Sequence, residues 1–172
     1  MSFSLNPRAG WMAQRFSSSL ERMQENQATP SLAEEFGVEG EWSMAVRHRI
    51  RWAECDLYGH VNHTAYLVMF EDLRVAHWRS LGQVLRADQA GPVVAKLEAR
   101  YVRALAFEDE VLLTLRVPGL RNTSFTHDYA VWKNGLCFEC KALLVCVKDG
   151  VSTPIPPEAR RLMIERDGAK PA

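Results

Sequence analysis

The strongest constraint on the fold of this chain is one long helical pattern followed by four segments that are typical of strands. Between residues 64 and 81, apolar side chains recur every three or four residues, which is the spacing of an amphipathic helix, and Gly82 follows as a C-terminal stop. The strand-like segments come after it, with turn residues between them, at 91–101, 110–120, 124–133 and 135–148. Asn134 and Gly135 both tolerate positive φ, so they favour a tight hairpin between the last two segments.

A further strand is predicted before the helix, at residues 43–55, where polar and apolar side chains alternate. The alternation places on one face Met44, Val46, His48, Ile50 and Trp52. A sheet of this kind must bury one face, and the long helix is the element available to cover it. The sequence therefore predicts an α+β fold in which a long central helix is wrapped by an antiparallel sheet of about five strands.

We divide the chain into a domain at residues 43–157, an N-terminal arm at 1–42 and a polar C-terminal tail at 158–172. Prolines end the strand-rich region, because proline cannot continue a sheet ladder. Short helices are expected near 32–36 in the arm and near 160–164 in the tail.

The arm carries apolar residues at helical spacing, namely Trp11, Met12, Phe16, Leu20 and Met23. We expect it to be helical and to pack on its own domain or on a partner subunit. Its basic and serine residues also resemble an organelle transit peptide, but Glu21 and Glu25 argue against that interpretation.

Charge and composition exclude several classes of function. The chain carries 21 Lys and Arg against 21 Asp and Glu, so it has no net charge to attract a phosphate backbone or an anionic membrane surface. No stretch approaches the roughly 20 apolar residues needed to span a bilayer, and the N-terminus lacks the apolar core of a secretory signal. We therefore expect a cytoplasmic protein with neither a nucleic-acid partner nor a membrane span.

The four cysteines form no disulfide framework. Cys137 and Cys140 are spaced as half of a zinc site or as a redox pair, but no second pair follows. Cys140 and Cys146 lie in an apolar run, where a thiol behaves as a small hydrophobic group. We interpret these residues as structural.

The densest chemistry lies between residues 51 and 63. Asp56 follows a predicted strand, Gly59 allows a sharp turn, and a helix begins shortly afterwards. Backbone amides at a helix N-terminus are unpaired and favour developing negative charge. A carboxylate beside such amides can act on a carbonyl or a water while the amides hold an oxyanion, as acyl transfer requires. The alternative is that Asp56 only stabilises the turn or caps the helix.

Residues 50–74, read as IRWAECDLYGHVNHTAYLVMFEDLR, resemble the signature of the 4-hydroxybenzoyl-CoA thioesterase-like family of hotdog-fold acyl thioesterases. The resemblance rests on an Asp, then Gly-His-Val-Asn, then a Tyr and a helical Glu-x-x-Arg, and it extends over about residues 44–157. It implies a hotdog fold, a homodimer or homotetramer, and an acyl-CoA substrate. It also implies that no cofactor or metal is needed, although Asp56, His60 and His63 have spacings that a metal triad would also allow.

The resemblance assigns catalytic roles to residues around the turn. Asp56 is the carboxylate that acts as nucleophile or as general base, Gly59 allows the turn, and His63 provides the backbone amide that polarises the thioester oxygen. His60 matches the histidine of the members that carry Gly-His-Val-Asn, which include plant-type acyl-ACP thioesterases. Asn62 either bonds to Asp56 or caps the helix.

Other residues are expected to contact the substrate. Tyr58 stands where the acyl-ACP enzymes have Asn. Tyr66 is expected at the subunit boundary or along the acyl tunnel. Glu71, which can pair with Arg74 one helical turn away, is an alternative catalytic carboxylate. Thr123 and Ser124 are expected to complete the pocket from the partner subunit.

The sequence therefore predicts an acyl-CoA thioesterase that releases a free acid, aryl or fatty, and CoA. Two alternatives stay open, an acyl-ACP thioesterase and a non-catalytic module that binds acyl-CoA. Arg100, Arg103 and Arg121 are candidates to hold the nucleotide phosphates, although a solvated strand face explains them equally well.

Overall fold

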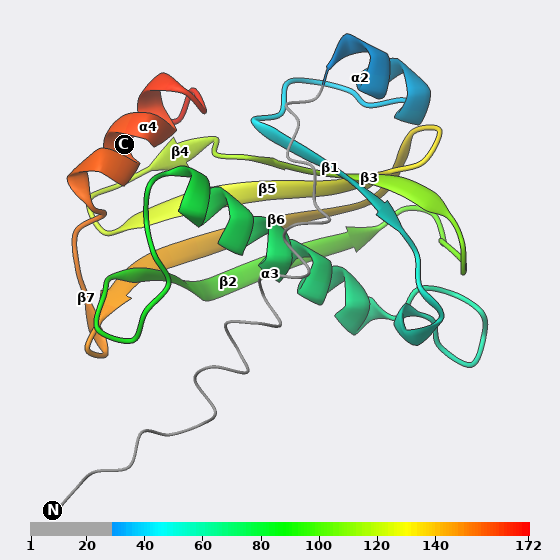
Figure 1. Cartoon of the computed structure of the whole chain (residues 1–172), viewed down its shortest axis with the longest axis horizontal. Helices are drawn as coiled ribbons and strands as arrows, with labels where there is room; N and C mark the ends of the chain where they lie inside the picture. Colours follow the sequence, from blue (N-terminus) through cyan, green and yellow to red (C-terminus); the bar gives the residue numbers. More distant parts are fainter. Residues whose placement is uncertain (1–28) are drawn as a thin grey trace, which may run out of the picture.

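One long helix lies across a curled antiparallel sheet in the computed structural model, which describes residues 29–172 (Figure 1). The elements are α2 (Pro30–Phe36), β1 (Met44–Arg49), the 3-10 helix η1 (Trp52–Glu54), α3 (His63–Ser80), β2 (Gly91–Tyr101), β3 (Glu110–Arg116), β4 (Gly119–Leu120), β5 (Ser124–Trp132), β6 (Leu136–Lys148), β7 (Val151–Ser152), α4 (Pro157–Glu165) and β8 (Lys170–Pro171). The amphipathic segment expected around residues 11–23 lies outside the described residues.

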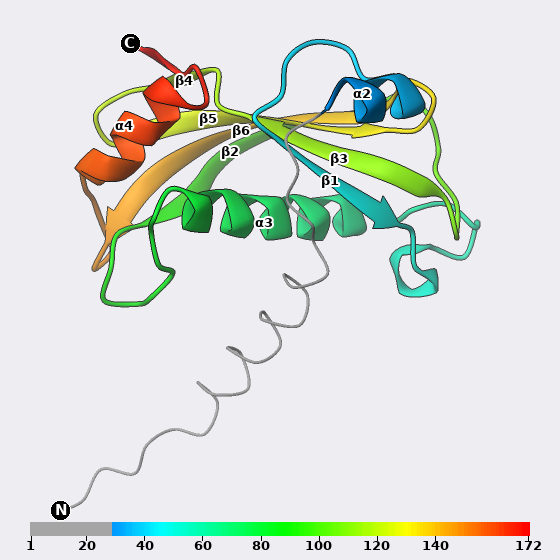
Figure 2. The same cartoon turned by 45° about the horizontal axis from the view of Figure 1, so that its top comes forward.

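The long strands follow one another across the sheet in the order β1, β3, β5, β6, β2, and every neighbouring pair is antiparallel. The short strands β4, β7 and β8 extend it. Asn134 and Gly135 have φ angles of 51° and 105°, so the hairpin predicted between β5 and β6 is confirmed. The sheet bends around α3 (Figure 2), and this confirms the α+β hotdog architecture.

Helix α3 buries one face against the concave side of the sheet, as its apolar spacing predicts. The rings of Tyr66 and Phe138 stack with their centroids 4.3 Å apart, and those of Phe70 and Tyr129 at 4.6 Å. Leu73 and Trp78 are buried further along the same face. These contacts hold the helix in one register along β5 and β6, and that register fixes where its N-terminus emerges.

The first strand is shorter than the alternation predicts. It ends at Arg49, and Trp52, expected on the buried face, is 75% exposed. The backbone amide of Ile50 donates to the carbonyl of Asp109, after which the chain enters the 3-10 turn and leaves the sheet. The prediction for Trp52 was therefore wrong, because a local turn ended the strand period before that residue.

Helix α2 lies on the outer face of the sheet, opposite α3 (Figure 2), and a second apolar cluster forms between α2 and the sheet. There α2 packs Phe36 against residues of β1, β3 and β5, and the members of the cluster are Phe36, Ala45, Leu112, Ala130 and Trp132. The short helix expected at 32–36 is confirmed as α2, and residues 30–36 of the arm belong to the packed structure.

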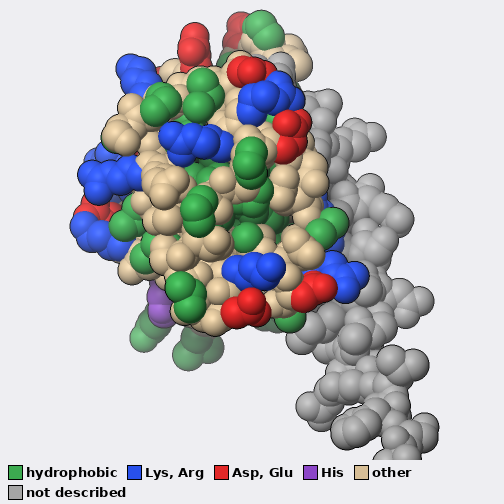
Figure 3. Space-filling model, turned by 90° about the vertical axis from the view of Figure 1, so that its left-hand side faces the viewer, with side chains coloured by type: hydrophobic (Ala, Val, Ile, Leu, Met, Phe, Trp, Pro, Cys, Tyr) green, Lys and Arg blue, Asp and Glu red, His purple; other side chains and the backbone are tan. Residues whose placement is uncertain are grey.

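The last segment of the chain is packed into the main core. Ala159, Met163 and Ala169 are buried there, and the side chain of Asp167 is fully buried against His77. The segment expected as a polar tail is thus polar on one side only. On the face that carries α4 and β7, acidic and basic side chains are scattered among hydrophobic ones (Figure 3).

The four cysteines are free, and Cys137, Cys140 and Cys146 are buried on β6. Burial raises the pKa of Cys140 to about 11, which keeps the thiol protonated. Among residues 29–172, no helix is long and apolar enough to cross a membrane.

Candidate active site

The candidate site is a short hairpin that leads from η1 into α3. An antiparallel bridge joins Cys55 to Val61, and between them the amide of Asp56 donates to the carbonyl of His60 at 2.8 Å. The amide of Gly59 donates to the Asp56 carbonyl at 3.1 Å, and Gly59 has a φ of 79°, a conformation that favours glycine. The turn thus requires Gly59 for its backbone angles.

The carboxylate of Asp56 is partly buried inside this hairpin. Its Oδ1 atom accepts hydrogen bonds from the backbone amides of Tyr58 at 2.9 Å and His60 at 3.2 Å. Its Oδ2 atom forms no hydrogen bond with any side chain or amide in residues 29–172. One oxygen therefore holds the turn, and the other is left to act on a substrate or a water.

The N-terminus of α3 begins two residues after the hairpin closes. Asn62 is the N-cap, and its Oδ1 atom accepts from the amide and the hydroxyl of Thr64 at 2.9 and 2.8 Å. This is the capping role that the sequence offered as one alternative for Asn62. The His63 amide forms no hydrogen bond within the described part of the chain, as expected for the first residue of a helix. The hairpin thus places the Asp56 carboxylate a few residues before the His63 amide, which carries partial positive charge at the helix N-terminus.

Glu54, which was not predicted from the sequence, contacts residues on both sides of the hairpin. Its buried carboxylate accepts hydrogen bonds from the amide and guanidinium of Arg51 and faces the ring of His48 at 3.0 Å. Burial alone would raise the pKa of Glu54, but the hydrogen bonds from His48 and Arg51 outweigh it and lower the pKa to about 2. A Glu three residues after Arg51 was the signal available, since this spacing is that of a capping box.

The other residues of the turn face solvent. His60 and His63 are exposed, and Tyr58 and Leu57 are 83% and 96% exposed. Beside them Trp52 and Phe107 meet edge to face with their centroids 5.7 Å apart. The rim of the candidate site is therefore both apolar and uncovered in the single chain.

Two predicted site residues lie along α3, away from the hairpin. Tyr66 is buried in the core, and burial raises the pKa of its hydroxyl to about 12. Glu71 pairs with Arg74 at 2.9 Å, as predicted, but it stands eight residues beyond His63, about 12 Å along the helix axis. Within one chain, neither side chain belongs to the hairpin.

Thr123 and Ser124 lie at the other end of the sheet. Ser124 begins β5, whereas the hairpin adjoins the start of β3, which pairs with the end of β5. Strand β5 has nine residues and thus spans about 30 Å. The predicted site is not completed within a single chain.

Strand β2 is an uncovered edge of the sheet. It pairs with β6 on one side, its other side has no partner strand in residues 29–172, and no residue along it is fully buried. Val93, Leu97 and Tyr101 are apolar residues exposed on it. An edge of this length is a template for pairing with another strand.

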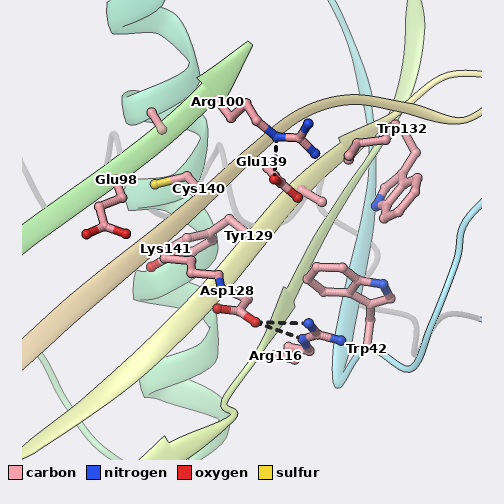
Figure 4. Close-up of a pocket in the computed structure, with 13 residues that line it drawn as sticks. Trp42, Glu98, Arg100, Arg116, Asp128, Tyr129, Trp132, Glu139, Cys140 and Lys141 are labelled. Carbon is pink, nitrogen blue, oxygen red and sulfur yellow. Dashed lines mark hydrogen bonds and ion pairs between the residues drawn. The ribbon is translucent and has the colours of Figure 1, made fainter. Parts of the chain in front are cut away.

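A separate hollow of about 320 Å³ lies on the outer face of the sheet beside Trp42 and Trp132 (Figure 4). Four of its charged groups form two pairs, Arg116 with Asp128 at 3.0 Å and Arg100 with Glu139 at 2.6 Å, and Glu98 and Lys141 also line it. Unlike Asp56, none of these charged groups lies beside the N-terminus of a helix, since they stand on the strands of the sheet. Among the described residues, no three His, Cys, Asp or Glu side chains gather as a metal site.

A protein-family model described as the thioesterase-like superfamily matches residues 50–162, which contain the hairpin and most of the sheet. The match covers well over half of the chain.

Solved structures share the fold. A thioesterase-superfamily protein from Jannaschia sp. CCS1 is 27% identical and has a TM-score of 0.76, covering 87% of this chain and 97% of its own. A thioesterase from Thermus thermophilus, complexed with coenzyme A and Zn, is 25% identical with a TM-score of 0.67, covering 74% and 96%.

A curated relative is also similar in sequence. The uncharacterized protein YsmA of Bacillus subtilis (strain 168) is 25% identical over 80 residues, which is 46% of this chain. The chain spans about half of that relative, 54% of its length.

Proposed function

The chain belongs to the thioesterase-like superfamily, and on this basis we propose that it hydrolyses an acyl-CoA thioester to a free acid and CoA. The observation that carries the proposal is the hairpin itself, in which the Asp56 carboxylate keeps one oxygen without a hydrogen-bond partner from residues 29–172, beside the start of α3. The coenzyme A bound to the Thermus thermophilus thioesterase supports the choice of carrier. We further propose that, within this superfamily, the chain belongs with the 4-hydroxybenzoyl-CoA thioesterase-like family that residues 50–74 resemble.

Two routes use the free oxygen of Asp56. As a nucleophile it attacks the thioester carbon, the C–S bond breaks, CoA leaves as thiolate, and water hydrolyses the resulting anhydride. As a general base it takes a proton from water, whose oxygen attacks the same carbon, and the C–S bond then breaks to release the free acid and the CoA thiolate. In both routes the carbonyl oxygen becomes negative, and the His63 amide at the helix terminus stabilises it, an effect of a few kcal/mol for a well-aimed donor.

The remaining residues of the turn have supporting roles in this proposal. Gly59 holds the backbone angles, Asn62 fixes the first turn of α3, and the exposed His60 and Tyr58 contact the substrate. Tyr66 supports the acyl pocket from the core through its stack on Phe138. Glu71 lines the pocket further along α3.

We propose that the active unit is at least a homodimer joined through β2. If two copies of β2 pair antiparallel, the Gly91 end of one strand lies beside the Tyr101 end of the other. Ser124 pairs with Val145 in β6, near the Gly91 end of β2. The partner's Thr123 and Ser124 are then carried to the end of the sheet that bears Asp56, where they complete the site. A homotetramer built from such dimers is compatible with this arrangement.

We propose that no metal or cofactor takes part, because a thiolate is a good leaving group and a carboxylate with aimed amides suffices for the chemistry. A cytoplasmic location is part of the same proposal, supported by four free cysteines.

The test is release of thiol from a panel of aryl-, short-, medium- and long-chain acyl-CoAs. Turnover of at least one member, lost in Asp56→Asn, supports the proposal. Turnover that survives in Asp56→Asn would remove Asp56 from the mechanism. Hydrolysis of acyl-ACP alone would favour the carrier-protein alternative, and tight binding of acyl-CoA without turnover would favour the binding module.

A further inference from the structure

Glu54 is a buried carboxylate that the two routes above do not use. Its side chain is 8% exposed, and a buried charge is costly unless it is paired and hydrogen-bonded. Oε2 accepts from the Arg51 amide at 2.7 Å and faces His48 Nε2 at 3.0 Å. Oε1 accepts from Arg51 Nε at 2.9 Å and from a terminal guanidinium nitrogen at 2.6 Å. Four contacts therefore fix both oxygens.

The partners of Glu54 come from elements that surround the hairpin. His48 belongs to β1, and Arg51 is the residue before η1. The backbone carbonyl of Glu54 accepts from the amide of Asn62 at 2.8 Å, and Asn62 is the N-cap of α3. One residue thus ties the sheet, the 3-10 turn and the start of the helix together, two positions before Asp56.

The electrostatic surroundings of Glu54 keep it ionised. His48 and Arg51 face it with donors, and Asp72 of α3 is a further acidic group beside the same small hollow. Burial raises the pKa of Asp72, whose charge is also opposed by Glu71 and favoured by Arg51. Arg51 is therefore attracted by the charges of both Glu54 and Asp72, but its guanidinium donates its hydrogen bonds to Glu54.

We propose that Glu54 is the positioning residue of this site: its carboxylate, held by His48 and Arg51, and its carbonyl, held by Asn62, fix the Asp56 hairpin relative to the N-terminus of α3. The inference rests on the proposed function for its kinetic consequence. A hairpin released from this anchor leaves Asp56 and the His63 amide chemically intact but misplaced, and misplacement by about 1 Å costs up to roughly a hundredfold in rate.

The kinetic test compares full-length wild type with Glu54→Gln, Glu54→Asp and Glu35→Gln. Glu35 is the matched control, because it is an exposed Glu paired with Arg47 of the same strand β1. We expect Glu54→Gln to lower kcat for an acyl-CoA about ten- to a hundredfold with KM within about threefold, because substrate contacts are kept. Glu54→Asp, which keeps the charge, should recover most of the loss, and Glu35→Gln should match wild type. Wild-type kcat in Glu54→Gln, or no recovery in Glu54→Asp, would overturn the assignment.

A second readout does not depend on turnover. Hydrogen exchange of the backbone amides of residues 55–63 should accelerate at least about tenfold in Glu54→Gln and stay unchanged in Glu35→Gln, because local opening follows the loss of the anchor. His48→Gln provides a milder variant should Glu54→Gln fail to fold, and we expect a smaller acceleration. Unchanged exchange in both variants would overturn the anchor. A wild type that hydrolyses no thioester would instead overturn the proposed function, while the exchange data still decide the anchor.

Discussion

The two ends of α3 differ in their exposure to solvent and in how far along the chain their contacts reach. At the N-terminal end, a local hairpin within residues 54–62 leads into the helix, and the side chains of Leu57, Tyr58, His60 and His63 are open to solvent. At the C-terminal end, His77 bonds to Asp167, which lies 90 residues later in the chain, and both side chains are almost fully buried. The open end is suited to chemistry and the closed end to stability.

The closed end is a dense polar cluster within the core. His77 Nε2 lies 2.7 Å from Asp167 Oδ2, and Arg166 donates to Asp167 and to the carbonyl of Ser80. Burial would raise the pKa of Asp167, but the hydrogen bonds from His77 and Arg166 outweigh it and lower the pKa. The ring of His127 meets His77 at 4.9 Å, and burial followed by the charge of His77 lowers the pKa of His127, so it stays neutral. The cluster ties α4 to α3.

Asp56→Asn removes the carboxylate charge from the open end of α3 and leaves the closed end unchanged. We expect Asp56→Asn to lower kcat by about a thousandfold, or about 4 kcal/mol in transition-state stabilisation, because the free oxygen loses its charge. Thiol release from the best acyl-CoA of the panel measures the loss. The control is Asp88→Asn, an exposed carboxylate paired with Arg86. A loss of less than about tenfold would contradict the role of Asp56.

The converse change acts on the closed end. Asp167→Ala leaves His77 and Arg166 without their shared acceptor, and breaking a buried pair in this way costs about 3 kcal/mol or more in the free energy of unfolding. Urea denaturation followed by tryptophan fluorescence measures it. A loss below about 1 kcal/mol would mean that the segment after residue 157 adds little to the stability of the core.

Acid should weaken both ends, since each contains a carboxylate whose pKa is lower in the folded state. Such a group binds fewer protons when folded, so its stabilising contribution is complete above its unfolded pKa near 4 and is lost as the pH falls. For Glu54, with a folded pKa of about 2, the contribution has an upper limit of about 3 kcal/mol. The free energy of unfolding should therefore fall between about pH 5 and about pH 2. A slope unchanged in the double variant Glu54→Gln/Asp167→Asn would contradict this origin.

The smallest expected effect concerns the cap of the open end. Asn62→Ala removes the acceptor for Thr64 and should reduce the free energy of unfolding by about 1 kcal/mol. Asn62→Asp, which keeps a capping oxygen, serves as the control. Equal stability with a large loss of kcat would indicate that Asn62 acts on Asp56 instead of on the helix.

The open end was largely predictable from sequence, and the closed end was not. The pattern of α3, the cap at Asn62, the turn at Gly59 and the Asn134-Gly135 hairpin all depend on residues within a few positions of one another. The partnership of His77 with Asp167 depends on the folded path of the 90 residues that separate them, so spacing along the chain does not indicate it.

The same reason explains the errors near the site. The alternation of polar and apolar residues continues through Trp52, but the strand ends at Arg49. The chain leaves the sheet there because the Ile50 amide bonds to the carbonyl of Asp109, on a loop far along the chain. Glu54 was overlooked because its partner His48 lies across a strand end, where spacing along the chain no longer reports distance. Periodicity describes a segment, whereas these contacts join segments.

The exposed edge of β2 has a practical consequence for anyone handling this protein. This strand has eleven residues, and the side that faces away from β6 has no partner strand in residues 29–172, so it favours indiscriminate pairing with other strands. In the proposed dimer, pairing through this edge would also protect the chain against aggregation. Changes in β2 are accordingly expected to show themselves first as poor recovery of protein from the cell, before any loss of activity can be measured.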